Sequence, residues 1–94
     1  NHKKLGRLVE WAKKSSQNNH RIIQIFRILE KNAACLKVET LKSEITRNGI
    51  KLCNFYSLKT DAGHSHGKVF IEVDGFVKIC PRPRDIIEQK FPAV

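Results

Sequence analysis

The chain has 94 residues, 40% of them hydrophobic and 29% charged, which is enough for the core of one compact domain and leaves no room for a second. Its net charge of +9 comes entirely from residues 1–60, where 13 Lys or Arg outnumber four Glu, and such one-sided basic charge favours a polyanionic partner. No apolar run approaches the roughly 18 residues of a membrane span, and the basic, amphipathic start is unlike a secretory signal, so we expect an intracellular protein without a membrane partner.

The first third of the chain contains two stretches with apolar residues at helical spacing. The first stretch predicts a helix over residues 3–15. Its apolar positions are Leu5, Leu8, Val9 and Ala12, with Trp11 beside them. The second predicts a helix over residues 20–31 that forms the centre of the core. Its apolar face comprises Ile22, Ile25, Phe26 and Leu29, widened by Ile23 and Ile28. Polar residues 15–19 are typical of a linker, and Asn18 or Asn19 is placed to cap the second helix.

The middle of the chain predicts two further helices after a short apolar segment. Residues 33–38 fit either an extended connector or a short strand. Val38, Leu41 and Ile45 then restore a helical period over residues 39–48, and Gly49 is a typical helix stop because glycine readily takes positive φ. Residues 51–59 favour another helix, although their mixed aromatic and aliphatic content also allows a strand.

The clearest local signal is the pair Asp74 and Gly75 between two β-rich runs. Such a pair favours a type I′ turn and predicts antiparallel strands over residues 68–73 and 76–80, with Val73 opposite Phe76. In this register five residues share one face of the hairpin. They are Val69, Ile71, Val73, Phe76 and Cys80.

The last segment predicts a short helix after the hairpin. Pro81 and Pro83 end the second strand because proline cannot donate to a strand ladder. Asp85 is placed to cap the helix that follows. The apolar residues that dock it onto the core are Ile86, Ile87 and Phe91.

The order of these elements resembles the winged-helix superfamily over residues 20–80, on the pattern of helix, short strand, two helices and hairpin alone. The resemblance implies an α+β fold, namely a winged helix with an extra N-terminal helix and a short C-terminal helix. In this interpretation residues 1–19 hold the N-terminal helix and its linker, and residues 81–94 form a C-terminal extension of the same single domain.

The resemblance also implies a site, because the third helix enters the major groove in DNA-binding members. Residues 51–59 take that place, with Leu52, Phe55 and either Tyr56 or Leu58 facing the core. The predicted nucleic-acid-binding residues are Lys42, Arg47, Asn48, Lys51, Asn54, Ser57 and Lys59. In this set Asn54 would pair with adenine and lysine would reach guanine or phosphate. Lys42, Arg47 and Asn48 would make backbone contacts that position the domain.

The predicted wing tip carries carboxylates at Glu72 and Asp74, which repel phosphates. Two hypotheses therefore stay open. The first is duplex DNA binding, with DNA favoured over RNA. The second is a protein-interaction winged helix within a nucleic-acid-processing assembly, since fold alone does not decide function.

The chain has three cysteines, an odd number with no close pair, which argues against a disulfide framework. They are Cys35, Cys53 and Cys80, and their apolar neighbours predict buried free thiols. Free thiols indicate a reducing compartment, nuclear or otherwise intracellular.

His64 and His66 lack the usual spacing of metal ligands. The chain has no phosphate-binding glycine loop or nucleophile motif. We therefore expect no metal, no cofactor and no enzymatic activity.

Overall fold

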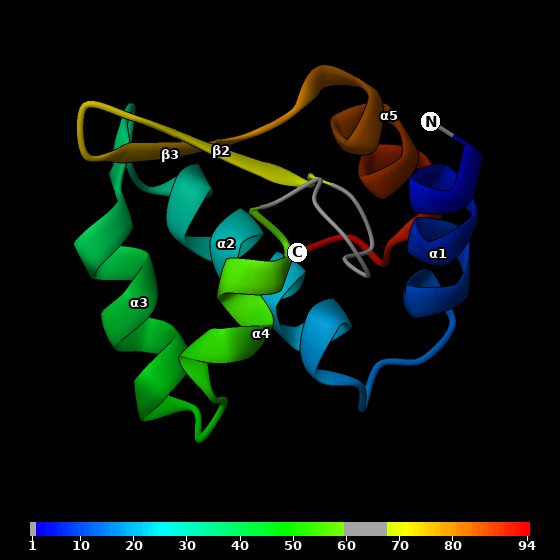
Figure 1. Cartoon of the computed structure of the whole chain (residues 1–94), viewed down its shortest axis with the longest axis horizontal. Coiled ribbons are helices and arrows are strands. Elements are labelled where there is room, and N and C mark those ends of the chain that lie inside the picture. Colours follow the sequence, from blue (N-terminus) through cyan, green and yellow to red (C-terminus); the bar gives the residue numbers. More distant parts are fainter. Residues whose placement is uncertain (1, 60–67) are drawn as a thin grey trace.

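A computed structural model of the chain describes residues 2–59 and 68–94, with side chains in the first helix from residue 6 onward. This part of the chain has an α+β fold of five helices and a three-stranded antiparallel sheet. The helices are α1 (His2–Ala12), α2 (Asn18–Lys31), α3 (Val38–Arg47), α4 (Leu52–Ser57) and α5 (Pro81–Lys90), and the strands are β1 (Leu36–Lys37), β2 (Phe70–Val73) and β3 (Phe76–Ile79) (Figure 1). No helix within these residues is long and apolar enough to cross a bilayer.

The sheet has the strand order β1-β3-β2. The hairpin register predicted from the turn is confirmed, because Val73 lies opposite Phe76 in an antiparallel pair. Asp74 has φ 53° and Gly75 has φ 82°, the left-handed backbone that a type I′ turn requires at both central residues. Residues 33–38 contain the short strand that the sequence allowed, since Leu36 pairs with Val77 of β3.

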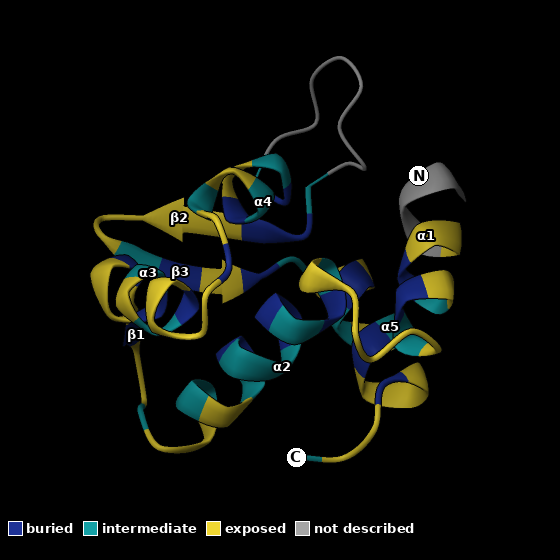
Figure 2. Cartoon of the chain, turned by 90° about the horizontal axis from the view of Figure 1, so that it is seen from below, coloured by how far each residue is buried: buried dark blue, intermediate teal, exposed yellow. Residues whose placement is uncertain are grey.

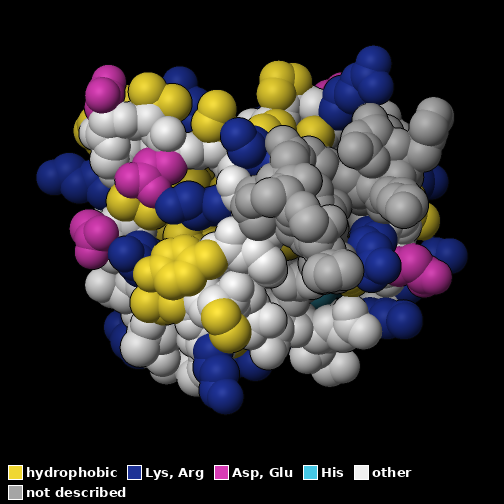
Figure 3. Space-filling view, in the orientation of Figure 1, with side chains coloured by type: hydrophobic (Ala, Val, Ile, Leu, Met, Phe, Trp, Pro, Cys, Tyr) yellow, Lys and Arg dark blue, Asp and Glu magenta, His cyan; other side chains and the backbone are white. Residues whose placement is uncertain are grey.

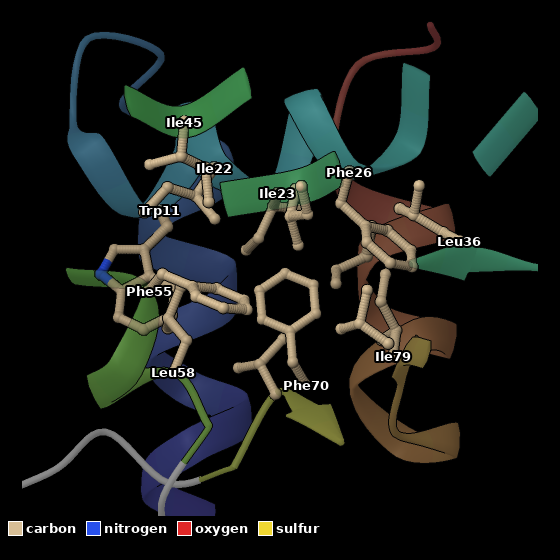
Figure 4. Close-up of a cluster of buried hydrophobic side chains, with 14 of the residues drawn as sticks. Trp11, Ile22, Ile23, Phe26, Leu36, Ile45, Phe55, Leu58, Phe70 and Ile79 are labelled. Atoms are coloured by element: carbon tan, nitrogen blue, oxygen red, sulfur yellow. The ribbon is translucent and has the colours of Figure 1, made fainter. Parts of the chain in front are cut away.

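One hydrophobic core lies between the sheet and the helices, where buried residues of α2, β3 and α4 face one another (Figure 2). Phe70 of β2 lies at its centre, with its ring centroid 5.2 Å from that of Phe26 on α2 and 5.6 Å from that of Phe55 on α4 (Figure 4). All three rings are completely buried. The aromatic cluster therefore fixes where α4 sits relative to the hairpin.

Helix α1 packs against α5, so the first and last helices lie together at one side of the molecule (Figure 1). His20 links them to α2, because its Nδ1–H donates to the Trp11 carbonyl at 2.7 Å and its ring stacks on Phe91 with centroids 4.9 Å apart. Ile87 and Phe91 are buried, as the sequence predicted for the final helix. The N-terminal helix and the C-terminal extension thus share one packing surface.

Both side-chain caps predicted from the sequence are wrong. Helix α2 already includes Asn18 and Asn19, and its N-cap is Gln17 without a side-chain cap bond. Helix α5 begins at Pro81 with Cys80 as N-cap, so Asp85 lies inside the helix. For α5 the physical reason is that proline has its φ preset for the first helical turn, where its missing N–H is not needed.

Two predictions of burial are also wrong, although the thiols are free as expected. Ile28 is 52% exposed rather than part of the core face of α2. Cys35 and Cys53 are exposed and Cys80 is half-buried. Apolar neighbours in sequence do not share a helical face with the residue between them, and Cys53 on α4 projects away from the core that holds Phe55. His64 and His66 lie outside the described residues, among which no group of His, Cys, Asp or Glu is arranged to hold a metal ion.

Candidate nucleic-acid interface

The connection between α3 and α4 is a tight turn. Asn48 ends α3, with its Nδ2 donating to the Glu44 carbonyl at 2.8 Å, and its own carbonyl accepts a hydrogen bond from Arg21 of α2 at 2.9 Å. Gly49 follows with φ 76°, which confirms the predicted helix stop. These contacts, together with the buried Ile50, fix the angle between the two helices.

The orientation of α4 decides which of its side chains reach solvent. Phe55 and Leu58 are completely buried, whereas Tyr56 is 45% exposed, so the choice left open by the sequence falls on Leu58 as the core residue. The Leu58 carbonyl accepts the backbone N–H groups of Val69 and Phe70 at 2.7 and 3.0 Å, which ties the end of α4 to β2. The outward surface of α4 therefore presents Tyr56 and, one turn earlier, Cys53.

Two lysine ammonium groups lie near the Tyr56 ring. The Nζ of Lys42 on α3 is 5.6 Å from the Tyr56 ring centroid, and the Nζ of Lys59 is 5.9 Å from it. Both distances fall within the range of cation–π attraction. Hydrogen bonding to Tyr56, helped by the nearby carboxylate of Glu39, raises the pKa of Lys42, so this ammonium stays charged at neutral pH. We call Lys42, Tyr56 and Lys59 the Tyr56 cluster.

Glu72 lies against this cluster rather than free at the tip of the hairpin. Its Oε1 is 2.5 Å from the Lys59 Nζ, and both side chains are largely shielded, with exposures of 35% and 25%. Glu72 points to the helix side of the hairpin because it shares that face with the buried Phe70, two residues earlier. The carboxylate that the sequence analysis expected to repel phosphate is therefore already neutralised by Lys59, while Asp74 is exposed in the turn.

The other predicted site residues differ in how free they are. Lys51 is exposed and has no ion pair within the described part of the chain. Arg47 is exposed and pairs with Glu44 at 2.7 Å. Asn54 and Ser57 are half-buried and bonded within their own helix, because Asn54 Nδ2 donates to the Lys51 carbonyl at 3.4 Å and Ser57 Oγ donates to the Asn54 carbonyl at 2.9 Å.

Tyr56, whose side the sequence left open, and Cys53, which the sequence predicted to be buried, both lie on the surface. The available signal was the spacing of three between Leu52, Phe55 and Leu58, which all lie toward the core and leave positions 53 and 56 outward. The interface therefore presents an aromatic side chain where an amide and a hydroxyl were expected.

Charge is mixed on the face of the chain that holds the Tyr56 cluster, which we call the α4 face. Four cations lie there with three carboxylates, which leaves one net positive charge. The cations are Lys42, Arg47, Lys51 and Lys59, and the carboxylates are those of Glu39, Glu44 and Glu72. Figure 3 shows the surface in the orientation of Figure 1, with basic, acidic and hydrophobic side chains interleaved over α4 and the hairpin. Most of the chain's basic excess lies elsewhere, so the face is suited to an oriented contact more than to bulk electrostatic attraction.

Comparisons with protein-family models, with curated proteins and with solved structures reveal no significant similarity to this chain. Its function is therefore inferred from the geometry of its own residues.

Proposed function

We propose that the chain is a winged-helix domain that binds duplex nucleic acid, DNA in preference to RNA, with α4 as the helix that enters the major groove. The topology supports this proposal, since β1 follows α2 and pairs with the second strand of the hairpin that comes after α3 and α4. The major groove of B-form DNA admits a helix, whereas the deep, narrow major groove of A-form RNA does not.

The observation that carries the proposal is the exposed Tyr56 with the ammonium groups of Lys42 and Lys59 near its ring. A helix in the groove would bring the Tyr56 ring and hydroxyl to base edges, where apolar contact and hydrogen bonding both distinguish bases. The ammonium group of Lys42 would meet a phosphate, whereas that of Lys59 stays paired with Glu72. Cys53 would lie beside Tyr56 on the same face of α4.

The ion pairs of these cations suggest how large the electrostatic contribution to binding would be. The pairs of Lys42 with Glu39 and of Arg47 with Glu44 each contain one side chain more than three-quarters exposed, so phosphate can replace the carboxylate at little cost. Lys51 has no carboxylate to release. Lys59 is held at 2.5 Å by a shielded Glu72. Three cations are then available, and three phosphate contacts correspond to a log–log salt slope of about −2.7.

A fluorescence-anisotropy titration tests the proposal, with a labelled DNA duplex, the matching single strand and the matching RNA duplex, each over a range of salt concentrations. We expect the DNA duplex to bind most tightly. Lys51→Ala should reduce the magnitude of the salt slope by about one unit, whereas Lys90→Ala, which removes the same charge from exposed α5, should not.

The result that overturns the proposal is the absence of duplex binding at ~50 mM salt, where electrostatic attraction is strong. Equal effects of the two lysine substitutions would also contradict it, because binding would then follow total charge and not the α4 face. In either case the protein-interaction alternative takes its place.

A further inference from the structure

The face of the sheet that points away from the helices is apolar. Helices α2, α3 and α4 all lie on one side of the hairpin (Figure 1), and Phe70, Val77 and Ile79 are buried against them. Strand alternation turns the residues between them to the opposite face. There Ile71 is 38% exposed and Val73 is 52% exposed. An antiparallel sheet with one face open to solvent normally carries polar residues on that face. Exposed apolar residues there indicate a surface that a binding partner covers.

Two lysines lie on the same face as these apolar residues. The register places Lys37 opposite Phe76, and Phe76 opposite Val73, so the three form one row across the sheet. Lys78 lies opposite Ile71 in the next row. Both lysines are exposed, and neither has an ion-pair partner among the residues that the structure describes. We call Lys37, Ile71, Val73, Phe76 and Lys78 the outer sheet face.

A pocket of about 180 Å³ adjoins the outer sheet face where β1 begins. Phe76 and Lys78 form part of its wall, together with Cys35, Leu36 and the ion pair of Glu30 with Arg84, whose Oε2 and Nη2 atoms are 2.5 Å apart. An apolar cavity of about 150 Å³ takes up a molecule of the size of benzene, so this pocket has room for one apolar side chain.

We propose that the outer sheet face binds an extended segment of another protein in which apolar residues are interleaved with aspartate or glutamate. The apolar side chains of such a segment would cover Ile71 and Val73, with one of them entering the pocket beside Phe76. Its carboxylates would pair with Lys37 and Lys78. A second copy of this chain is a poor occupant, because two molecules of charge +9 repel each other. Nucleic acid would satisfy the lysines but leave the apolar rows uncovered.

This inference is independent of nucleic-acid binding, since the outer sheet face and the Tyr56 cluster lie on opposite sides of the hairpin. Glu72, which contacts the cluster, projects to the helix side, whereas its neighbours Ile71 and Val73 project to the other. A bound segment and a bound duplex would therefore occupy the chain at the same time.

Selection of random linear peptides displayed on phage, with the full chain as bait, tests the proposal. We expect enriched peptides to interleave apolar and acidic residues, and synthetic copies of them to bind the chain in solution. Lys37→Glu with Lys78→Glu should weaken that binding at least about tenfold, because each reversal sets like charges against each other. Val73→Thr, which keeps the shape of the side chain and adds a hydroxyl, should weaken it as well.

The control is Lys51→Glu, which reverses one charge on the α4 face and should leave peptide binding unchanged. Thermal melts of all variants establish that they fold. Failure to enrich any peptide, enrichment of basic peptides, or peptide binding that withstands the Lys37 and Lys78 reversals in a folded chain would overturn the proposal. None of these results depends on whether the chain binds DNA.

Discussion

Replacing Glu72 with glutamine should strengthen duplex binding. In the native chain the Glu72 carboxylate holds the Lys59 ammonium at 2.5 Å in a pair that is partly exposed at the surface. Glutamine keeps an oxygen acceptor there but removes the negative charge, so Lys59 becomes available to a phosphate. The net charge of the α4 face rises from one to two.

The size of the effect follows from counterion release. One added phosphate contact contributes about 0.9 to the magnitude of the log–log salt slope, so the slope should change from about −2.7 to about −3.6. At ~0.1 M salt the same contribution raises the association constant roughly eightfold. The cost in folding stability should be small, about 0–1 kcal/mol, because a pair at the surface contributes little.

The assay is the anisotropy titration with labelled duplex at several salt concentrations, and Glu88→Gln is the matched control. Glu88 lies on α5, 3.5 Å from Arg84, and its loss changes the total charge by the same amount far from α4. If both variants bind duplex equally, the gain reflects total charge and the assigned role of Lys59 is refuted. If Glu72→Gln binds no better than the native chain, Lys59 does not contact phosphate.

Three further predictions concern recognition and folding. Tyr56→Ala should weaken duplex binding by about 1–3 kcal/mol through lost base contacts. Tyr56→Phe keeps the ring near Lys42 and Lys59 and should retain most of the affinity in the same titration, whereas equal losses for both variants would assign the effect to the hydroxyl alone. Phe70→Ala removes a completely buried ring and should lower the free energy of unfolding, measured with urea, by roughly 3–5 kcal/mol. This is a large share of the 5–15 kcal/mol typical of a domain, and a loss below about 1 kcal/mol would contradict the aromatic core. In Gly75→Ala the added methyl group meets no neighbouring atom, but the alanine must adopt φ 82°. The substitution should therefore lower the free energy of unfolding by roughly 1–2 kcal/mol and the melting temperature by several degrees. An unchanged melting temperature would contradict the type I′ turn.

Local signals in the sequence predicted the hairpin and the helices well. Asp74 and Gly75 set the strand register by themselves, because few residue pairs accept positive φ at both turn positions. The period of Ile22, Ile23 and Phe26 likewise identified the centre of the core. Such features depend on residues close in the chain, and their physics does not require knowledge of the fold.

The candidate site was harder to predict because it depends on contacts between distant elements. Helix α4 has only six residues, so its apolar period does not show whether Tyr56 or Leu58 faces the core. In the structure the hydrogen bonds between the Leu58 carbonyl and the backbone N–H groups of Val69 and Phe70 place Leu58 in the core. The pairing of Glu72 with Lys59 needs α4 to lie against the hairpin, which no local pattern specifies. The start of α5 at Pro81 was a missed local signal, since proline in the first turn is a helix-start preference.

The most direct test of duplex binding through α4 is a nuclear magnetic resonance titration that records the backbone amide signals of the whole chain as a DNA duplex is added. We expect the largest shifts at Cys53, Tyr56 and Lys59 and around the turn at Lys51, with the signals of Ile71 and Lys78 on the outer sheet face little changed. The contrary result is a set of shifts confined to α1 and α2, which carry the basic residues Arg7, Arg21, Arg27 and Lys31 outside α4. That pattern would show that the duplex meets the chain through its general positive charge and that α4 does not read DNA.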